Sequence, residues 1–256
     1  MVEEASGLDA ADDLAGLVTE RGMVRHDAML ARRLAGEPLQ YVLGRWAFRT
    51  LDLMVDQRVL IPRPETEAVV GHALAEFDRV GGGRDEVLVA DLGTGSGAIG
   101  LSIAAERVTA RVWCTDVSRD ALAVARANLT GLGRPARRVT ICEGSWFDGL
   151  PADLAGALDL LVSNPPYVAA GEPLPAEVAG WEPRSALVPG TDGTEALEAL
   201  IDGSVAWLRP GGALVLELAP CQASAMVDRA LSVGLATVDV RRDLAGRDRA
   251  LVARRP

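Results

Sequence analysis

The chain has 256 residues, 49% of them hydrophobic and 24% charged, a composition that supplies a sizeable core and excludes wholesale disorder. Its 26 basic and 36 acidic residues give a net charge of −10, and a negative field of this size disfavours indiscriminate nucleic-acid binding. No apolar run approaches the roughly 18 residues of a membrane-spanning helix, and the acidic start is unlike a signal peptide, so we expect a cytoplasmic protein with no membrane partner.

The first third of the chain predicts a small helical and β-hairpin region. Residues 8–36 have the apolar spacing of a helix, and alternation over residues 46–55 predicts a hairpin. The proline-rich segment Ile61–Glu67 then leads into a helix that begins near Pro64 and ends at Gly81–Gly83. We place a domain boundary there, with residues 1–82 before it and 83–256 after it.

The rest of the chain alternates strands and helices, which predicts a mostly parallel sheet with helices on both faces. A long helix is expected through Leu197, Leu200, Ile201 and Leu208 as far as Pro210. The final connection is too short for a crossover helix, so the last strand should run antiparallel to its predecessor. The expected strands cover residues 87–90, 111–115, 139–142, 158–162, 213–218, 237–240 and 250–253.

A glycine-rich loop follows the first strand of this sheet, in the segment Asp91–Gly97 (Asp91-Leu92-Gly93-Thr94-Gly95-Ser96-Gly97). Crowded glycines let a backbone approach a ligand closely. Asp116 ends the second strand, where its carboxylate is placed to accept hydrogen bonds from the two hydroxyls of a ribose. The spacing also satisfies the dinucleotide-binding pattern, so the loop alone indicates an adenosine-containing cofactor of either kind.

The fourth strand runs directly into Asn164-Pro165-Pro166-Tyr167. Because the two prolines fix the backbone and donate no hydrogen bond, the nearby carbonyls keep fixed directions. Together with the side-chain carbonyl of Asn164 they predict a pair of acceptors for a planar NH2 group, with Tyr167 against its face. A sulfonium methyl is a suitable electrophile for such a group. S-adenosylmethionine fits, because the glycine loop has no lysine or arginine for a phosphate, and the aromatic pair Trp146-Phe147 follows strand three where an adenine can rest.

In these motifs the chain resembles the protein-(glutamine-N5) methyltransferases, the family that includes the peptide-chain release factor methyltransferases. The similarity extends from residue 36 to the C-terminus and also includes the segments Ile61–Glu67, Glu182–Arg184 and Asp243–Arg249. The family carries a longer helical N-terminal domain before residue 36, so this region is expected to be shortened here. That departure leaves the identity of the methylated protein open.

The resemblance implies a Rossmann-like class I methyltransferase fold, an α/β fold with a seven-stranded sheet and a reversed last strand. It implies S-adenosylmethionine as cofactor, S-adenosylhomocysteine as product, and a release factor or related protein as substrate and partner. Asn164, Pro165 and Tyr167 are the expected catalytic residues, and Pro166 joins them in binding the glutamine amide. The expected cofactor-binding residues are Asp91, Gly93, Thr94, Gly95, Ser96, Gly97, Asp116, Trp146 and Asn164.

Three other interpretations stay open at this stage. One is an enzyme that methylates amino groups of adenine or guanine in RNA or DNA, which would want a basic surface near Tyr167. The others are a nicotinamide-dependent oxidoreductase and a cofactor-sensing protein without turnover. Six arginines near the C-terminus form either a basic patch for an anionic partner or ordinary solvated strand ends. No metal site is expected, because the three cysteines and two histidines show no paired spacing.

Overall fold

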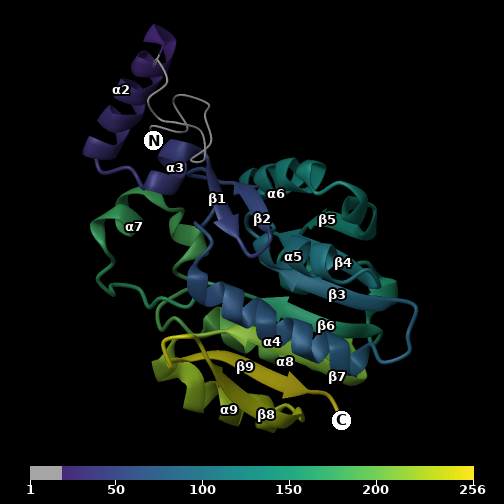
Figure 1. Cartoon of the computed structure of the whole chain (residues 1–256). Coiled ribbons are helices and arrows are strands. Elements are labelled where there is room, and N and C mark those ends of the chain that lie inside the picture. The colour runs from purple at the N-terminus through teal and green to yellow at the C-terminus, as the bar shows by residue number, and fades with distance from the viewer. Residues whose placement is uncertain (1–18) are drawn as a thin grey trace.

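A seven-stranded sheet forms the centre of the computed structural model, which describes residues 19–256 (Figure 1). The strand order is β5-β4-β3-β6-β7-β9-β8, and only β9 runs antiparallel to its neighbours. The predicted mostly parallel sheet with a reversed last strand is therefore confirmed. The strands are β3 (Val87–Leu92), β4 (Ala110–Asp116), β5 (Val139–Glu143), β6 (Leu158–Ser163), β7 (Leu208–Glu217), β8 (Ala236–Arg242) and β9 (Asp248–Arg254).

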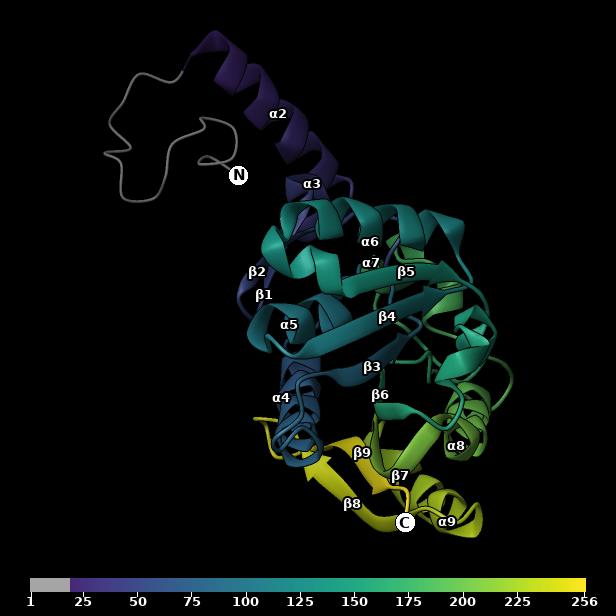
Figure 2. The same cartoon turned by 90° about the vertical axis from the view of Figure 1, so that its right-hand side faces the viewer.

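Helices cover both faces of the sheet, as Figure 2 shows with the molecule turned by 90°. One face carries α4 (Pro64–Val80), α5 (Ala98–Glu106) and α6 (Arg119–Gly131), whereas α8 (Glu195–Trp207) and α9 (Ala223–Ser232) cover the other. Strand residues alternate between the two apolar clusters: Val89 and Val162 face α4 and α5, and Ala90 and Leu161 face α8. This double burial explains why the strands read as continuous apolar runs.

The N-terminal region precedes α4 and packs against the main body. It contains α2 (Glu20–Leu34), α3 (Leu39–Leu43) and a hairpin of β1 (Arg45–Phe48) with β2 (Leu51–Met54), so the hairpin prediction is confirmed. Of the helix predicted over residues 8–36, Glu20–Leu34 is confirmed; α2 begins after Thr19, an extended N-cap, and residues 8–18 lie outside the described residues. Asn128 of α6 exchanges hydrogen bonds with the backbone of Met54, which fixes the hairpin to the main body.

Helix α4 begins at Pro64, as the proline at a first helical turn predicts. Its apolar side, which includes Val70, Leu74 and Phe77, is buried against the sheet beside α5. The helix thus packs with the main body although it precedes the boundary near residue 82, and that boundary stays a prediction.

One predicted helix end is wrong. The long helix α8 ends at Trp207, and Leu208 begins β7, where it pairs with Leu158 of β6. The apolar spacing carried the predicted helix past Trp207 toward Pro210, because a fully buried Leu208 fits the core equally well at the start of a strand. Two short elements complete the site-bearing loops, α7 (Ala176–Trp181) and the one-turn helix η4 (Arg184–Ala186).

Candidate functional site

The candidate site lies between β3 and β6, where the order in which the chain adds strands to the sheet reverses. The chain leaves β3 toward α5 on one face and leaves β6 toward α8 on the other, which makes this a topological switch point. Ser163 Oγ, at the end of β6, donates a hydrogen bond of 2.5 Å to the carbonyl of Leu92, at the end of β3. This bond ties together the glycine loop and the Asn-Pro-Pro-Tyr segment.

A cavity of about 210 Å³, which we call the main cavity, opens above these two strand ends. It brings together residues from the glycine loop, the ends of β4 and β5, the Asn-Pro-Pro-Tyr segment and the proline-rich segment before α4. The predicted site residues that line it are Gly93, Thr94, Gly95, Ser96, Asp116, Trp146, Asn164 and Pro166.

Two predicted cofactor residues, Asp91 and Gly97, are not part of this lining. Asp91 is fully buried beneath the loop, where its Oδ2 accepts hydrogen bonds from Thr94 Oγ1 (2.5 Å) and the Gly100 amide (2.9 Å). Gly97 is the N-cap of α5 and has a φ of 87°, a conformation that favours glycine. In this structure Asp91 supports the loop from below, and Gly97 joins it to α5.

Burial, together with the nearby charge of Asp116, raises the pKa of Asp91 to about 6, although the hydrogen bonds from Thr94 and the Gly100 amide oppose the rise. The second oxygen of Asp91, Oδ1, is buried and has no hydrogen-bond partner among the described residues. The glycine loop is therefore anchored on a carboxylate that is poorly compensated for its loss of water.

Asp116 lines the main cavity and also organises it. Its Oδ2 accepts a hydrogen bond of 2.9 Å from the Gly95 amide, and its Oδ1 accepts one of 2.9 Å from the Ser118 amide. Each carboxylate oxygen keeps a further lone pair, so Asp116 retains the capacity to accept from a ribose.

Trp146 lines the main cavity, whereas its neighbour Phe147 does not. The Trp146 ring lies so close to Gly93 that a Cβ on that glycine would come within 3.1 Å of it. Phe147 points away and stacks on Trp207, with ring centroids 5.8 Å apart. Of the predicted aromatic pair, only Trp146 is placed to contact an adenine.

A second, smaller cavity of about 70 Å³, which we call the side cavity, adjoins the first. All four residues of the Asn-Pro-Pro-Tyr segment line it, and Asn164 and Pro166 line both cavities. Among the described residues, no hydrogen bond reaches Asn164 Oδ1, and no loop or turn amide donates to the backbone carbonyl of Asn164 or Pro165. The predicted acceptors are thus free where the main cavity and the side cavity adjoin.

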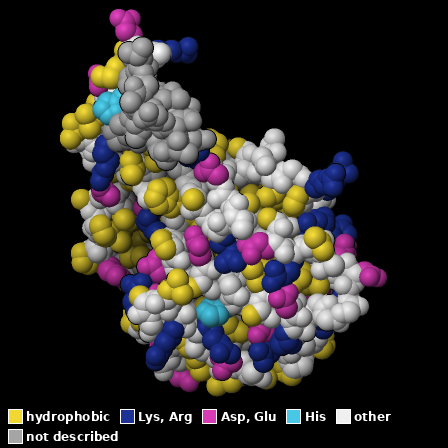
Figure 3. Space-filling view, in the orientation of Figure 1, with side chains coloured by type: hydrophobic (Ala, Val, Ile, Leu, Met, Phe, Trp, Pro, Cys, Tyr) yellow, Lys and Arg dark blue, Asp and Glu magenta, His cyan; other side chains and the backbone are white. Residues whose placement is uncertain are grey.

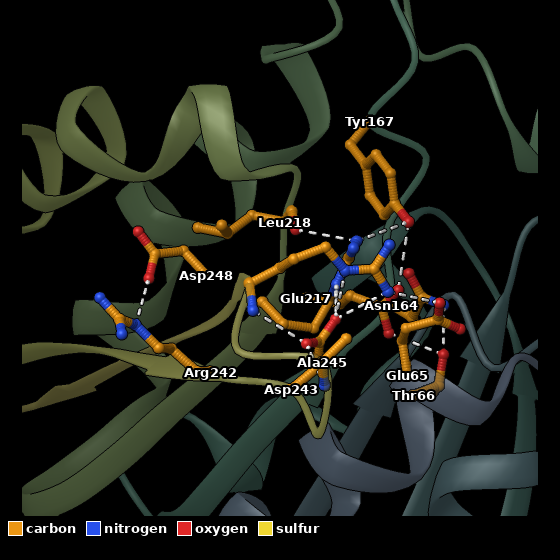
Figure 4. Close-up of polar contacts among 12 residues, drawn as sticks. Glu65, Thr66, Asn164, Tyr167, Glu217, Leu218, Arg242, Asp243, Ala245 and Asp248 are labelled. Atoms are coloured by element: carbon orange, nitrogen blue, oxygen red, sulfur yellow. Dashed lines mark hydrogen bonds and ion pairs between the residues drawn. The ribbon is translucent and has the colours of Figure 1, made fainter.

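Sequence reasoning missed two residues behind Asn164. Asn164 Nδ2 donates to Thr66 Oγ1 (3.2 Å), and Thr66 Oγ1 donates to Glu217 Oε2 (2.7 Å) at the end of β7. Glu217 Oε1 also accepts from the hydroxyl of Tyr167 (3.2 Å). Figure 4 shows Thr66, Asn164, Tyr167 and Glu217 converging from three segments of the chain.

Glu217 is almost fully buried, and burial raises its pKa while the Thr66 hydroxyl and the charge of Arg249 oppose the rise. Burial and the charge of Glu217 raise the pKa of Tyr167, so this phenol stays protonated and can donate. The sequence did carry a signal for Glu217, namely an acidic residue inside the otherwise apolar run of residues 213–218.

The two proline-containing segments of the resemblance meet over the main cavity. Glu182 accepts hydrogen bonds from the Ile61 amide (3.2 Å) and from the guanidinium of Arg63, and its own side chain is buried. Leu60, Pro62, Pro183 and Ser185, on either side of this contact, line the main cavity. The bond between this segment and Glu182 was not predicted from the sequence.

The C-terminal arginines are engaged within the protein. Arg241, Arg242, Arg247 and Arg254 form ion pairs of 2.7–3.4 Å with carboxylates, and Arg255 donates to the Leu208 carbonyl. Arg249 points inward, toward Tyr167 and Asp243. Figure 3 shows basic and acidic side chains interspersed over the face that carries α4 and β8. This pairing favours ordinary strand ends over a basic patch.

Two negative findings concern the described part of the chain alone. Within residues 19–256, no three histidine, cysteine, aspartate or glutamate side chains are grouped so as to hold a metal ion. None of the helices described is long and apolar enough to cross a membrane.

Comparisons with known proteins identify the family and the fold. Residues 82–177 match the model of the methyltransferase small domain. The release factor glutamine methyltransferase of Xylella fastidiosa (strain 9a5c) is 45% identical over 90% of this chain and 80% of its own length.

Solved structures support the fold alone, because their sequence identities are low. A methyltransferase from Pyrococcus furiosus has a TM-score of 0.57 at 18% identity, covering 90% of this chain and 97% of that one. The 16S rRNA N2 G1207 methyltransferase of T. thermophilus, solved with AdoMet and guanosine, has a TM-score of 0.56 at 16% identity, covering 83% and 50%. Identity, coverage and the site motifs together place this chain in the family of release factor glutamine methyltransferases.

Proposed function

We propose that the protein transfers a methyl group from S-adenosylmethionine to the side-chain amide nitrogen of a glutamine in a protein, and that a peptide-chain release factor is its substrate. One observation carries the proposal: Asn164 and Pro166 line both cavities, so a group held by the Asn-Pro-Pro-Tyr segment faces the space above the glycine loop. Membership of the family supports the reaction, and the name of the relatives supports the substrate.

The main cavity suits the cofactor in its chemistry. The carboxylate of Asp116 would hold the ribose, and the Trp146 ring would contact the adenine. Arg58 is the basic residue of the lining, and its guanidinium is paired with Asp56, in keeping with a ligand that has no phosphate. S-adenosylmethionine would supply a methyl group on a positively charged sulfur. The groups of this chain then have to present a nitrogen to it.

The Asn-Pro-Pro-Tyr segment would present that nitrogen by holding both of its hydrogens. Asn164 Oδ1 and the Pro165 carbonyl are the acceptors, and Tyr167 lines the same small cavity beside them. An amide nitrogen is a poor nucleophile because its lone pair is delocalised into the carbonyl. Two fixed acceptors polarise the NH2 group and direct its lone pair toward the cofactor. Such orientation can lower a barrier by roughly 7–11 kcal/mol, and proton loss would follow the transfer.

The alternative of methylation on adenine or guanine has less support. It calls for a basic surface leading to Tyr167, whereas Arg249, the arginine beside that residue, is directed into the protein and bound to Leu218 and Asp243. The other C-terminal arginines described above are paired as well. The fold similarity to an rRNA methyltransferase does not separate the two substrates.

The experiment is incubation of the protein with radiolabelled S-adenosylmethionine and a purified release factor, followed by peptide mapping. We expect label on one glutamine of the release factor and none on RNA or DNA added in parallel. Asn164→Ala should reduce turnover by about 10²–10³-fold, the usual cost of one lost preorganised hydrogen bond at a reacting group. Label on nucleic acid, or full turnover in Asn164→Ala, would contradict the proposal.

A further inference from the structure

The hydrogen bonds behind Asn164 have a fixed direction. A carboxylate accepts hydrogen bonds and donates none, so in the bond of 2.7 Å between them the Thr66 hydroxyl is the donor and Glu217 Oε2 is the acceptor. The oxygen of Thr66 is then an acceptor toward Asn164, and it takes the Nδ2 group at 3.2 Å. Because Nδ2 is occupied in this way, Oδ1 is the atom of Asn164 that remains for the cavities.

The other end of the network fixes the same direction. Arg249 Nη1 is a donor only, and it lies 3.5 Å from the hydroxyl of Tyr167 and 3.3 Å from the Leu218 carbonyl. The phenol proton therefore points to Glu217 Oε1, 3.2 Å away. Each oxygen of Glu217 thus accepts one hydrogen bond, Oε1 from Tyr167 and Oε2 from Thr66.

Shape alone does not decide which way the Asn164 carboxamide faces. Its oxygen and its NH2 group are nearly equal in size, so a rotation by a half turn fits the same space and exchanges an acceptor for a donor. The choice depends on what the neighbouring group can donate or accept, and here that neighbour is Thr66.

We propose that Glu217 is a positioning residue: acting through Thr66, it holds the Asn164 carboxamide with Oδ1 turned toward the methyl acceptor. The nature of that acceptor rests on the proposed function, whereas the orientation itself is a property of this chain. The proposal gives a role to an acidic residue at the end of β7 that touches neither cavity.

Glu217→Gln is the decisive variant, because it keeps the shape and reverses one bond. The oxygen of the new amide stays with the donor Tyr167, so its NH2 group faces Thr66 and donates to it. Thr66 must then donate to Asn164, which turns Oδ1 inward and presents NH2 to the cavities. We expect kcat on a glutamine peptide to fall by about 10–10³-fold, with the dissociation constant for S-adenosylmethionine changed by less than about twofold.

Thr66 provides an independent variant if Glu217→Gln does not fold. Thr66→Val removes the hydroxyl at almost constant volume and should lower kcat in the same way, and Thr66→Ser should recover most of what is lost. Ser204→Ala is the matched control, because Ser204 is fully buried in α8 and bonded only to the Ile201 carbonyl. Wild-type kcat in both Glu217→Gln and Thr66→Val would overturn the proposal.

A second readout needs no turnover. The chain has two asparagines, Asn128 and Asn164, so ¹⁵N labelling of asparagine gives two side-chain NH2 signals by NMR. Asn128 Nδ2 is bonded to the Met54 and Ser96 carbonyls and serves as an internal reference. Glu217→Gln should shift the Asn164 pair and speed its exchange with water, and should leave the Asn128 pair in place.

The two readouts separate this inference from the proposed function. A wild-type protein that methylates no glutamine would refute the function, and the Asn164 signals would still decide the orientation. An unshifted Asn164 pair in Glu217→Gln would overturn the inference even if kcat falls.

Discussion

The two sides of the switch point are built in different ways. On the β3–β4 side, one continuous loop, residues 93–97, turns over a buried carboxylate, Asp91. Within that loop the Gly95 amide donates to Asp116 and the Thr94 hydroxyl donates to Asp91. On the β6–β7 side, side chains from four separate segments, Thr66, Asn164, Glu217 and Arg249, form one directed network. We call these the loop side and the network side.

This difference predicts which measurable property a mutation on each side should change. The loop side offers backbone and a ribose acceptor, so changes there should affect binding of the cofactor or the stability of the loop. The network side sets the direction of hydrogen bonds, so changes there should affect kcat with little effect on cofactor binding. The variants of Glu217 and Thr66 test the second statement, and the variants below test the first.

Asp91→Asn should give the largest change in stability on the loop side. The raised pKa of about 6 means that ionised Asp91 destabilises the folded state, fully so above pH 6 and less as pH falls toward the ordinary value of 3.8. The variant removes this penalty and keeps an oxygen for Thr94 and Gly100. Its free energy of unfolding at pH 8 should therefore exceed that of the wild type, by at most about 3 kcal/mol.

Urea unfolding of both proteins at pH 8 and pH 5 measures this, with a smaller advantage at pH 5. Equal stability at pH 8, or an advantage that does not depend on pH, would show that Asp91 is compensated in a way the structure does not reveal. The loop side would then carry no penalty from a poorly compensated buried charge.

Asp116→Ala should have the next largest effect, and it should be an effect on binding. Losing a charge-assisted hydrogen bond costs about 1.5–3 kcal/mol, so we expect the dissociation constant for S-adenosylmethionine, measured by calorimetry, to rise by about 10–100-fold. Once the cofactor is saturating, kcat should stay within about threefold of the wild type, because no residue of the network side contacts Asp116.

The control for this variant is Glu143→Ala, at the end of the neighbouring strand β5. Glu143 is exposed, pairs with Arg119 and does not line the main cavity. Unchanged affinity in Asp116→Ala would remove Asp116 from the ribose site, and a large fall in kcat at saturation would break the division between the two sides.

The loop side could be predicted well from the sequence because its residues are contiguous. Strand, glycine loop, helix and Asp116 follow one another in the sequence, and Gly93, Thr94, Gly95 and Ser96 of this loop line the main cavity. The sequence did not show that Asp91 is buried beneath the loop, since a motif gives the order of residues and not which of them lie below it.

The network side could be predicted only where it is contiguous, at residues 164–167. Thr66, Glu217 and Arg249 lie 98 residues before Asn164, 53 after it and 85 after it, and only the strand order β6-β7-β9 and the packing of α4 bring them together. A single sequence holds no signal for such pairings beyond an acidic residue at the end of an apolar strand. The sequence predicted the acceptors and missed the residues that orient them.

Arg254→Ala should have the smallest effect, and it separates the network side from the rest of the C-terminal arginines. Arg254 lies on the same strand as Arg249, but it bonds to Glu76 of α4 at 2.7 Å and 3.0 Å and reaches neither cavity. Arg79 also binds Glu76, so the carboxylate keeps a partner in the variant. We expect a loss of about 1 kcal/mol in the free energy of unfolding at pH 7, with kcat and the affinity for the release factor unchanged.

The effect of Arg254→Ala on stability should depend on pH. Because its arginine partners lower the pKa of Glu76, this contribution is present near neutrality and is lost as pH falls through that pKa. Weaker, salt-dependent capture of the release factor by a normally stable Arg254→Ala would instead show that the paired arginines dock the substrate, and the network side would then extend to the outer edge of the sheet.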